Sequence, residues 1–202
     1  MKTSKIFKNT LVLGTTSALA VVAASQQALA EGPYIGFSAG AISGESPNDA
    51  ASSNDYSLQG NVMSIFAGVD RAINDNQFIG LELAYQGAAN GNKEDSSSYD
   101  YTYQLNYVVD AKVRYGASFG QNLSVYGFVG ASTGNANAYY SSSKYGGYSF
   151  FGANVGGGAQ MEVAGNVTAG IEYIHRFVKS GYDQAKRNSD HGLLSARLSM
   201  NF

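Results

Sequence analysis

Eight segments of the chain alternate apolar with polar or small residues at a period of two, which is the pattern of a β-strand with two unlike faces. In QFIGLELAYQ one face is formed by Ile79, Leu81, Leu83 and Tyr85, and in YTYQLNYVVDAKVRY Leu105 falls on the same face as Tyr107. The alternation predicts strands at residues 33–42, 61–71, 77–87, 101–115, 122–132, 150–163, 167–177 and 192–202. These strands are longer than the usual soluble strand of about five or six residues and match the ~9–11 that cross a bilayer when tilted.

The connections between these segments alternate in length. In chain order they have 18, 5, 13, 6, 17, 3 and 14 residues, so the long ones fall at one end of an antiparallel array and the short ones at the other. An even number of long strands with this asymmetry is typical of a transmembrane barrel with short periplasmic turns and long external loops. The sequence therefore predicts an all-β fold, an eight-stranded antiparallel up-and-down transmembrane β-barrel, with both termini at the periplasmic end.

Alternation alone does not say which face lies inside, and a soluble eight-stranded barrel with an apolar lumen is the alternative. The polar face is rich in glycine, which suits the crowded interior of a narrow barrel better than an exposed sheet surface. Its charged residues are few and nearly balanced in sign, unlike those of a solvated surface. On the apolar face, tyrosines lie toward the segment ends as in an interfacial girdle, at Tyr85, Tyr101, Tyr103, Tyr115 and Tyr173. We therefore expect polar residues inside and apolar residues in lipid.

The first 30 residues have the composition of a secretory signal peptide. Three lysines precede the apolar run LVLGTTSALAVVAA, and a small-x-small exit follows at Ala28 to Ala30. The run is too short to span a bilayer and is interrupted by Gly14, which argues against the alternative of an N-terminal membrane anchor. We expect residues 1–30 to be removed on export, and residues 31–202 to form a barrel in the bacterial outer membrane.

The composition of the remaining chain excludes several classes of function. Without residues 1–30 it keeps 10 of the 13 basic residues and all 15 acidic ones, a formal charge of −5. A net negative chain with scattered basic residues is not expected to bind nucleic acid. The chain has no cysteine, so disulfides and thiolate ligands are absent, and its His, Asp and Glu residues show no metal-ligand spacing. We expect no cofactor and no metal.

The interior of an eight-stranded barrel is just filled by side chains, which leaves no room for a wide pore. Charged groups confined there should form pairs, because an uncompensated buried charge is costly. Counting residues from the short-turn end brings Glu82, Glu172 and Arg197 to a similar depth near the middle of the barrel. These three residues form the predicted ion-pair cluster of the lumen.

These features resemble the small eight-stranded outer-membrane barrels of Gram-negative bacteria, of the opacity-protein, OmpX and OmpA-barrel type. The resemblance rests on PYIGFSAGA in the first strand, IFAGVDRAINDNQFIGLELAY as a hairpin, IEYIHRF in the penultimate strand and LLSARLSMNF at the end. It implies that the outer-membrane assembly machinery reads the terminal aromatic residue and the alternate apolar residues before it, which are Leu194, Leu198, Met200 and Phe202. It also implies a monomer that contacts outer-membrane lipids and lipopolysaccharide.

The function of such a barrel depends on its loops rather than on its fold. The third predicted loop has the Ser-, Gly- and Asn-rich composition of adaptable binding surfaces, with the tyrosines Tyr139, Tyr140, Tyr145 and Tyr148. We expect a structural or adhesin-like protein that contacts host surface molecules, and not an enzyme. For the loop itself the alternative is a solvated, variable segment, and for the whole chain it is a low-conductance channel for ions or small solutes.

A lipid A-modifying enzyme is the third function to consider. Acyl transfer would need a serine, a histidine base and an acidic residue that orients it. His175 lies on the apolar face near the external rim, where the deacylase barrels carry a serine two positions further on, but that position is here Phe177. We therefore predict no catalytic residue and expect His175 to be an interfacial histidine at the level of the lipid headgroups.

Overall fold

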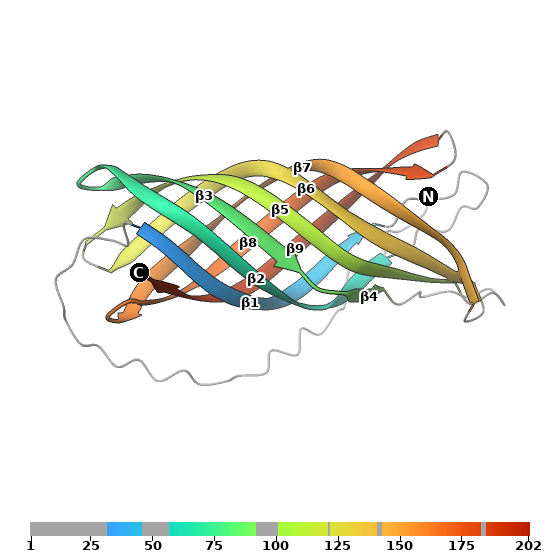
Figure 1. Ribbon diagram of the computed structural model, residues 1–202, viewed down its shortest axis with the longest axis horizontal. Helices are drawn as coiled ribbons and strands as arrows, with labels where there is room; N and C mark the ends of the chain where they lie inside the picture. The colour runs from blue at the N-terminus through green and yellow to red at the C-terminus, as the bar shows by residue number, and fades with distance from the viewer. Residues whose placement is uncertain (1–31, 46–56, 92–100, 121, 141–142, 183–184) are drawn as a thin grey trace, which may run out of the picture.

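The computed structural model describes residues 32–45, 57–91, 101–120, 122–140, 143–182 and 185–202. The predicted signal peptide lies outside these ranges. Their backbone forms strands β1 (Gly32–Glu45), β2 (Ser57–Asn74), β3 (Gln77–Gln86), β4 (Ala89–Gly91), β5 (Tyr101–Phe119), β6 (Leu123–Tyr140), β7 (Ser143–Ala164), β8 (Val167–Tyr182) and β9 (Ala185–Asn201). In Figure 1 the strands wind obliquely around one long axis. The described ranges contain no helix that is long and apolar enough to cross a membrane.

The strands form one closed antiparallel sheet. Strands that follow one another in the chain are neighbours, except β3 and β4. β1 pairs with β9, and the pairing of β3 with β5 closes the ring. After a break at residues 87–88, the short β4 continues the line of β3 and pairs with the same neighbour, β5. Because β3 and β4 together fill one position, the described residues confirm the predicted eight-stranded up-and-down barrel.

The connections from β2 to β3, from β5 to β6 and from β7 to β8 lie at one end of the barrel, which we call the turn end, and the opposite end is called the loop end. Two of these connections contain a glycine in the left-handed region, Gly120 with φ 67° and Gly165 with φ 51°, where other residues would be strained. In the third, the side chain of Asn74 accepts a hydrogen bond from the backbone N–H of Asn76 at 3.0 Å. The C-terminus lies at the turn end as well (Figure 1).

The strands are staggered around the barrel. Paired residues followed once around the ring from Tyr34 in β1 lead to His191 in β9 and then to Gly44, ten residues beyond the start. Such a stagger requires strands tilted by roughly 35–45° to the barrel axis. The tilt brings residues of different strand positions to one depth, which is how a compact cluster can form inside.

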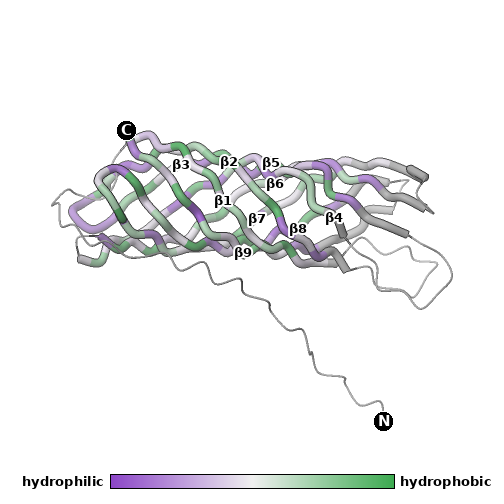
Figure 2. Tube along the Cα trace, turned by 90° about the horizontal axis from the view of Figure 1, so that it is seen from below, coloured by the Kyte–Doolittle hydropathy of each residue, from purple (hydrophilic) through white to green (hydrophobic). Residues whose placement is uncertain are grey.

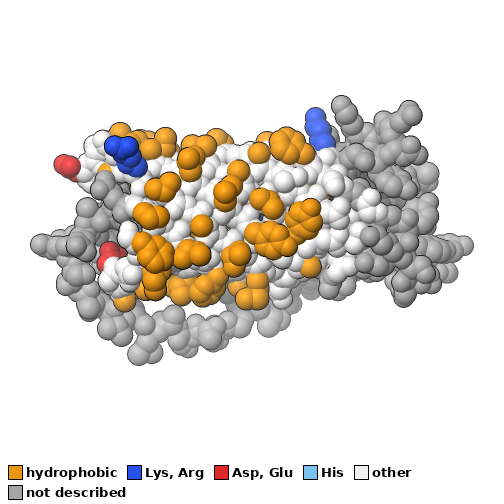
Figure 3. All heavy atoms as spheres, viewed as in Figure 1, with side chains coloured by type: hydrophobic (Ala, Val, Ile, Leu, Met, Phe, Trp, Pro, Cys, Tyr) orange, Lys and Arg blue, Asp and Glu red, His pale blue; other side chains and the backbone are white. Residues whose placement is uncertain are grey.

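Apolar side chains cover the outside of the barrel. In β3, Leu81 and Leu83 are 59% and 62% exposed, whereas Glu82 between them is 2% exposed. Figure 2 shows this alternation along the strands, and Figure 3 shows apolar side chains over the middle of the barrel with charged ones near its ends. The predicted orientation, with charged residues inside and apolar residues outside, is confirmed for the described strands.

Many glycines of the inner face pack against an aromatic ring. A Cβ atom at Gly36 would collide with the Phe66 ring, and one at Gly156 would collide with the Phe128 ring. The other such pairs are Gly68 with Tyr34, Gly116 with Phe78, Gly134 with Phe150 and Gly158 with Tyr126. The inner glycines therefore make room for flat side chains, and the lumen is more aromatic than the sequence pattern suggested.

Two of the predicted long loops are wrong. β6 runs to Tyr140 and β7 begins at Ser143, while β8 runs to Tyr182 and β9 begins at Ala185. Strands therefore occupy most of the predicted loops at 133–149 and 178–191. The sequence of these segments is polar at successive positions, which removes the alternation on which the prediction relied, but their backbones still pair in register.

A bulge in β5 reverses the side-chain alternation near the loop end. Leu105 pairs with Ala136 and Tyr107 pairs with Asn135, so Asn106 is an extra residue in β5. The sequence pattern placed Leu105 on the outer face, but it is fully buried and belongs to an apolar cluster inside the barrel. A single inserted residue shifts the phase of a strand by one, which simple alternation cannot reveal.

If the exposed apolar belt faces lipid, a charge in its middle will be costly while a charge at its rim is tolerated. We expect Leu83→Arg to lower the free energy of unfolding from lipid vesicles by ~2–4 kcal/mol. The matched control is Ile73→Arg, next to the turn of β2 and β3, which should cost ~0–1 kcal/mol. Equal, small effects of both substitutions would contradict a lipid-facing surface.

Candidate functional site

Four charged side chains meet in the middle of the lumen and bond to one another in a ring, which we call the central square. Its members are Glu82 of β3, Lys112 of β5, Glu172 of β8 and Arg197 of β9. Lys112 Nζ lies 2.9 Å from Glu82 Oε1 and 2.6 Å from Glu172 Oε1. Arg197 bonds the same two carboxylates, donating to Glu82 Oε1 at 3.1 Å and also to Glu172. Each cation therefore bridges both anions.

The structure brings together the three residues that depth counting selected, Glu82, Glu172 and Arg197. The sequence analysis missed Lys112, although it lay on the polar face of its segment and faces Glu82 directly in the register of β3 and β5. Register was the missing information, because the stagger between strands decides which charges meet.

Arg114 extends the central square toward the turn end. Its Nη1 lies 3.3 Å from Asp70 Oδ2 and 3.4 Å from Glu82 Oε2, and its Nη2 donates to Gln160 Oε1 at 3.0 Å. Arg114 also donates to the hydroxyl of Tyr34, which in turn donates to Glu82 Oε2 at 2.9 Å. The charges of this enlarged cluster balance, since three cations face three carboxylates, counting Asp70 with the two glutamates.

Balance is necessary here because every member of the cluster is nearly removed from solvent. The exposed fraction is 2% for Glu82, 1% for Arg114 and 9% for Arg197. Isolated charges at such positions would be strongly destabilising, whereas charges that are paired and hydrogen-bonded recover much of the desolvation cost. Tyr126 adds one such bond, donating from its hydroxyl to Glu172 Oε2 at 2.9 Å.

A second buried ion pair crosses the lumen nearer the loop end. Arg176 of β8 holds Asp110 of β5 through two bonds, from Nε to Oδ1 at 3.0 Å and from Nη2 to Oδ2 at 2.7 Å. Ser132 donates to Asp110 Oδ1 at 2.6 Å, and Asn154 donates to Ser132 at 2.9 Å. The two hydrogen bonds fix the plane of the guanidinium group, so this pair is a rigid link across the lumen.

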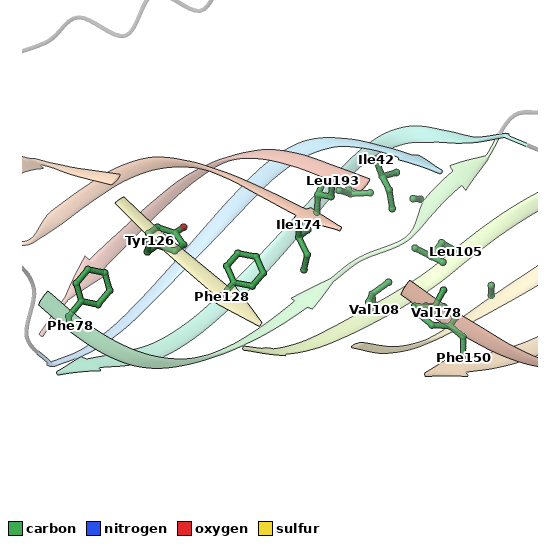
Figure 4. Close-up of a cluster of buried hydrophobic side chains, with 13 residues drawn as sticks. Ile42, Phe78, Leu105, Val108, Tyr126, Phe128, Phe150, Ile174, Val178 and Leu193 are labelled. Carbon is green, nitrogen blue, oxygen red and sulfur yellow. The ribbon is translucent and has the colours of Figure 1, made fainter. Parts of the chain in front are cut away.

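An apolar cluster occupies the lumen toward the loop end beyond these charges. Leu105, Val108 and Ala136 are fully buried, and Phe150 and Val178 are 3% and 2% exposed. Figure 4 shows Leu105, Val108, Phe150 and Val178 together at one end of the barrel, with Ile42, Ile174 and Leu193 between them and the middle. The lumen is therefore filled by ion pairs in its middle and by apolar side chains at the loop end.

The predicted assembly residues lie at the end of β9 and point outward. Leu194 is 59% exposed, Met200 is 43% exposed and Phe202 is 72% exposed, while Leu198 is partly exposed. The chain end is fixed by its backbone: Phe202 donates to the carbonyl of Pro33 at 3.0 Å, and Asn201 donates to that of Asn166 at 2.8 Å. The last strand thus closes against β1 and the turn before β8.

The surroundings of His175 contain no serine contact among the described residues. Its Nδ1 lies 3.4 Å from the hydroxyl of Tyr173, and its Nε2 lies 3.8 Å from Asp190 Oδ2. Its ring stacks edge-on against Phe177, with 4.4 Å between ring centres. The described residues also contain no group of three or more His, Asp or Glu side chains placed to hold a metal.

The four tyrosines of the predicted binding loop fall on strands rather than in a loop. Tyr139 and Tyr140 end β6, and Tyr145 and Tyr148 lie in β7. Their side chains are outside the part of the chain that the structure describes, so only their backbone positions are known. The structure places all four on one hairpin at the loop end.

A closed antiparallel barrel with an apolar exterior and a lumen filled by ion pairs defines a transmembrane β-barrel. The sequence matches the family model of the outer membrane protein beta-barrel domain over residues 14–202. The chain therefore belongs to this family, and its location is the bacterial outer membrane.

Solved structures that are similar to this chain include three bacterial barrels. Neisserial surface protein A (NspA) matches with a TM-score of 0.58 and 20% identity, over 86% of this chain and 99% of that one. Ail, the attachment invasion locus protein of Yersinia pestis, has a TM-score of 0.48 and 16% identity over 84% and 99%. The N-terminal barrel domain of OprF from Pseudomonas aeruginosa has a TM-score of 0.42 and 15% identity over 86% and 99%. No curated protein sequence matches the chain.

Removing one cation from the central square should be strongly destabilising, because it leaves two buried carboxylates under-compensated. We expect Arg197→Met to lower the free energy of unfolding by ~3–5 kcal/mol, measured by urea titration in lipid vesicles. The control is Arg71→Met, which removes an exposed arginine near the turn end and should leave stability unchanged. If both variants unfold at the urea concentration of the parent, the square does not brace the barrel.

Proposed function

We propose that this protein is a non-conducting, non-catalytic outer-membrane barrel whose loop-end hairpins form a cell-surface interaction platform. The observation that carries the proposal is strand length: β7 has 22 residues and β6 has 18, whereas ~9–11 suffice to cross a bilayer. The additional residues continue the β6–β7 hairpin beyond the apolar belt. A hairpin with a paired backbone fixes the positions of its residues along the strands, as a recognition surface requires.

In this proposal the turn end and both termini face the periplasm, and the loop end faces the outside of the cell. Short turns at one end and long excursions at the other are the usual arrangement in this class of barrel. The apolar belt contacts outer-membrane lipids and lipopolysaccharide as a monomer. The outward-facing residues Leu194, Leu198, Met200 and Phe202 then lie where the assembly machinery would read them, and the tyrosine-bearing hairpin lies where host surface molecules would meet it.

The runner-up function is a low-conductance channel. The central square and the Asp110–Arg176 pair both span the lumen, and the apolar cluster follows them toward the loop end. Hydrated ions would have to separate buried charge pairs and then pass apolar side chains. These barriers favour a closed barrel over a channel.

We expect the refolded protein to give no stable current steps in planar bilayers across physiological voltages. The reason is that a hydrated ion would have to separate the buried, bonded charges of the central square in order to pass the middle of the lumen. A porin inserted in the same bilayer serves as the positive control. Regular, reproducible current steps from the purified barrel would instead support the channel function.

The surface role is tested on the β6–β7 hairpin. Asn137 and Gly147 are paired, so replacing residues 138–146 by an Asn-Gly turn shortens the hairpin without changing the register below it. We expect this variant to bind host cells or extracellular matrix at least ~5-fold more weakly than the parent if the hairpin carries a main contact.

The matched control keeps the full-length hairpin and changes Tyr139, Tyr140, Tyr145 and Tyr148 to Ser. Loss of binding in both variants assigns the contact to the tyrosines, and loss in the shortened variant alone assigns it to the backbone or its other residues. Parental binding by the shortened variant contradicts the proposed role of this hairpin.

A lipid A-modifying activity is the third candidate, and the contacts of His175 with Tyr173, Phe177 and Asp190 do not favour it. Incubating the refolded protein with lipopolysaccharide and measuring the acyl chains by mass spectrometry tests it directly. We expect unchanged acyl chains, since no serine contacts the histidine among the described residues. Removal or transfer of one acyl chain would overturn the non-catalytic proposal.

A further inference from the structure

Each cation of the enlarged central cluster lies against the face of an aromatic ring. Arg197 Cζ lies 3.8 Å from the centre of the Phe66 ring. Arg114 Cζ lies 4.0 Å from the centre of the Tyr126 ring, and Lys112 Nζ lies 4.8 Å from that of Phe128. All three distances fall within the ~6 Å over which a ring face attracts a cation, and the attraction is stronger where water is excluded.

The three rings are held in place by the neighbouring strand. Phe66 of β2 packs on Gly36 of β1, so closely that a Cβ atom there would collide with the ring. Phe128 and Tyr126 of β6 pack in the same way on Gly156 and Gly158 of β7, respectively. Each ring therefore packs against the backbone of the neighbouring strand and also lies against a cation.

The bonding pattern of the central square limits how it can rearrange. Lys112 and Arg197 each bond both Glu82 and Glu172, so every cation–carboxylate pairing in the square is already made. Within the square, therefore, a departing cation has no unmade pairing with Glu82 or Glu172 to move to. A cation that moves away must leave both carboxylates and its aromatic ring together.

We propose that Phe66, Tyr126 and Phe128 are positioning residues that hold Arg197, Arg114 and Lys112 in place and make the cluster a fixed lock rather than a switchable gate. The inference rests on the proposed function, since it explains how the closed lumen stays closed. In this proposal the inner glycines have a role as well, because they make room for the rings that hold the cations.

A double-mutant cycle tests the link between ring and cation. Phe66→Leu and Arg197→Met are made singly and together, and the free energy of unfolding is measured by urea titration in lipid vesicles. A direct ring–cation contact should make the two effects non-additive by ~5- to 30-fold in the unfolding equilibrium constant. Effects that add to within about twofold would overturn the inference.

The matched control is a second cycle in which Phe150, a ring outside the central cluster, takes the place of Phe66. Phe150 is equally buried but packs edge-on against His191 toward the loop end, with 6.1 Å between ring centres. Phe150→Leu should therefore be additive with Arg197→Met. If Phe66→Leu does not refold, the cycle of Phe128→Leu with Lys112→Met gives the same comparison on the second cation.

A spectroscopic measurement separates positioning from simple space filling. In the parent, protons of the Arg197 guanidinium should be shifted upfield in NMR spectra of the barrel in nanodiscs, because they lie over the Phe66 ring. Phe66→Tyr keeps the ring and should keep the shift, whereas Phe66→Leu should abolish it. An Arg197 spectrum unchanged by Phe66→Leu would contradict the contact.

These results can be told apart from a failure of the proposed function. Ring–cation coupling in a barrel that conducts would overturn the closed-lumen proposal and leave the contact standing. A barrel that gives no current steps and shows no ring–cation coupling would overturn this inference and leave the closed-lumen proposal intact.

Discussion

The constraint on which the rest of this barrel depends is that charges inside a narrow lumen must be neutralised by one another. The carboxylates of Glu82 and Glu172 are both buried, and each is bonded by Lys112 and by Arg197. These residues come from strands β3, β5, β8 and β9, so the square ties strand positions that lie on different sides of the ring. The ten-residue stagger brings them to one depth, and a different register would leave buried charges without partners.

Aromatic and apolar residues complete what the ion pairs begin. Rings seated on inner glycines fill the space beside the cations, and the Asp110–Arg176 pair and the apolar cluster fill the lumen toward the loop end. The outer face carries large apolar side chains that pair with lipid rather than with other protein elements. The fold of such a barrel is therefore determined by charge balance in its lumen and by hydrophobic burial of its outer face in the membrane.

The sequence predicted the architecture well because lipid imposes a strict alternation. Wherever one face meets hydrocarbon and the other meets the lumen, as around Leu81, Glu82 and Leu83, a period of two is unavoidable. The prediction failed where that condition ends. Residues 137–140 and 143–147 are strand without alternation, and the bulge at Asn106 turned Leu105 inward.

The central cluster shows the same limit. Depth counting selected Glu82, Glu172 and Arg197 because polar-face charges are few, but Lys112 and Arg114 needed the register between β3 and β5. The aromatic partners were harder still to predict. Nothing in the spacing of Phe66 and Phe128 indicates a cation as their partner, and only the three-dimensional structure shows that they lie against Arg197 and Lys112.

The measurement that tests this account most directly is a double-mutant cycle across one edge of the square, between Lys112 and Glu172, whose Nζ and Oε1 atoms lie 2.6 Å apart. Lys112→Met and Glu172→Gln each remove one charge and leave the partner buried, whereas the double variant removes both. If the square holds the barrel together, the double variant will lose less free energy of unfolding than the two single variants lose in sum, by ~3 kcal/mol or more. Strictly additive losses would contradict the claim that paired charges inside the lumen organise this fold.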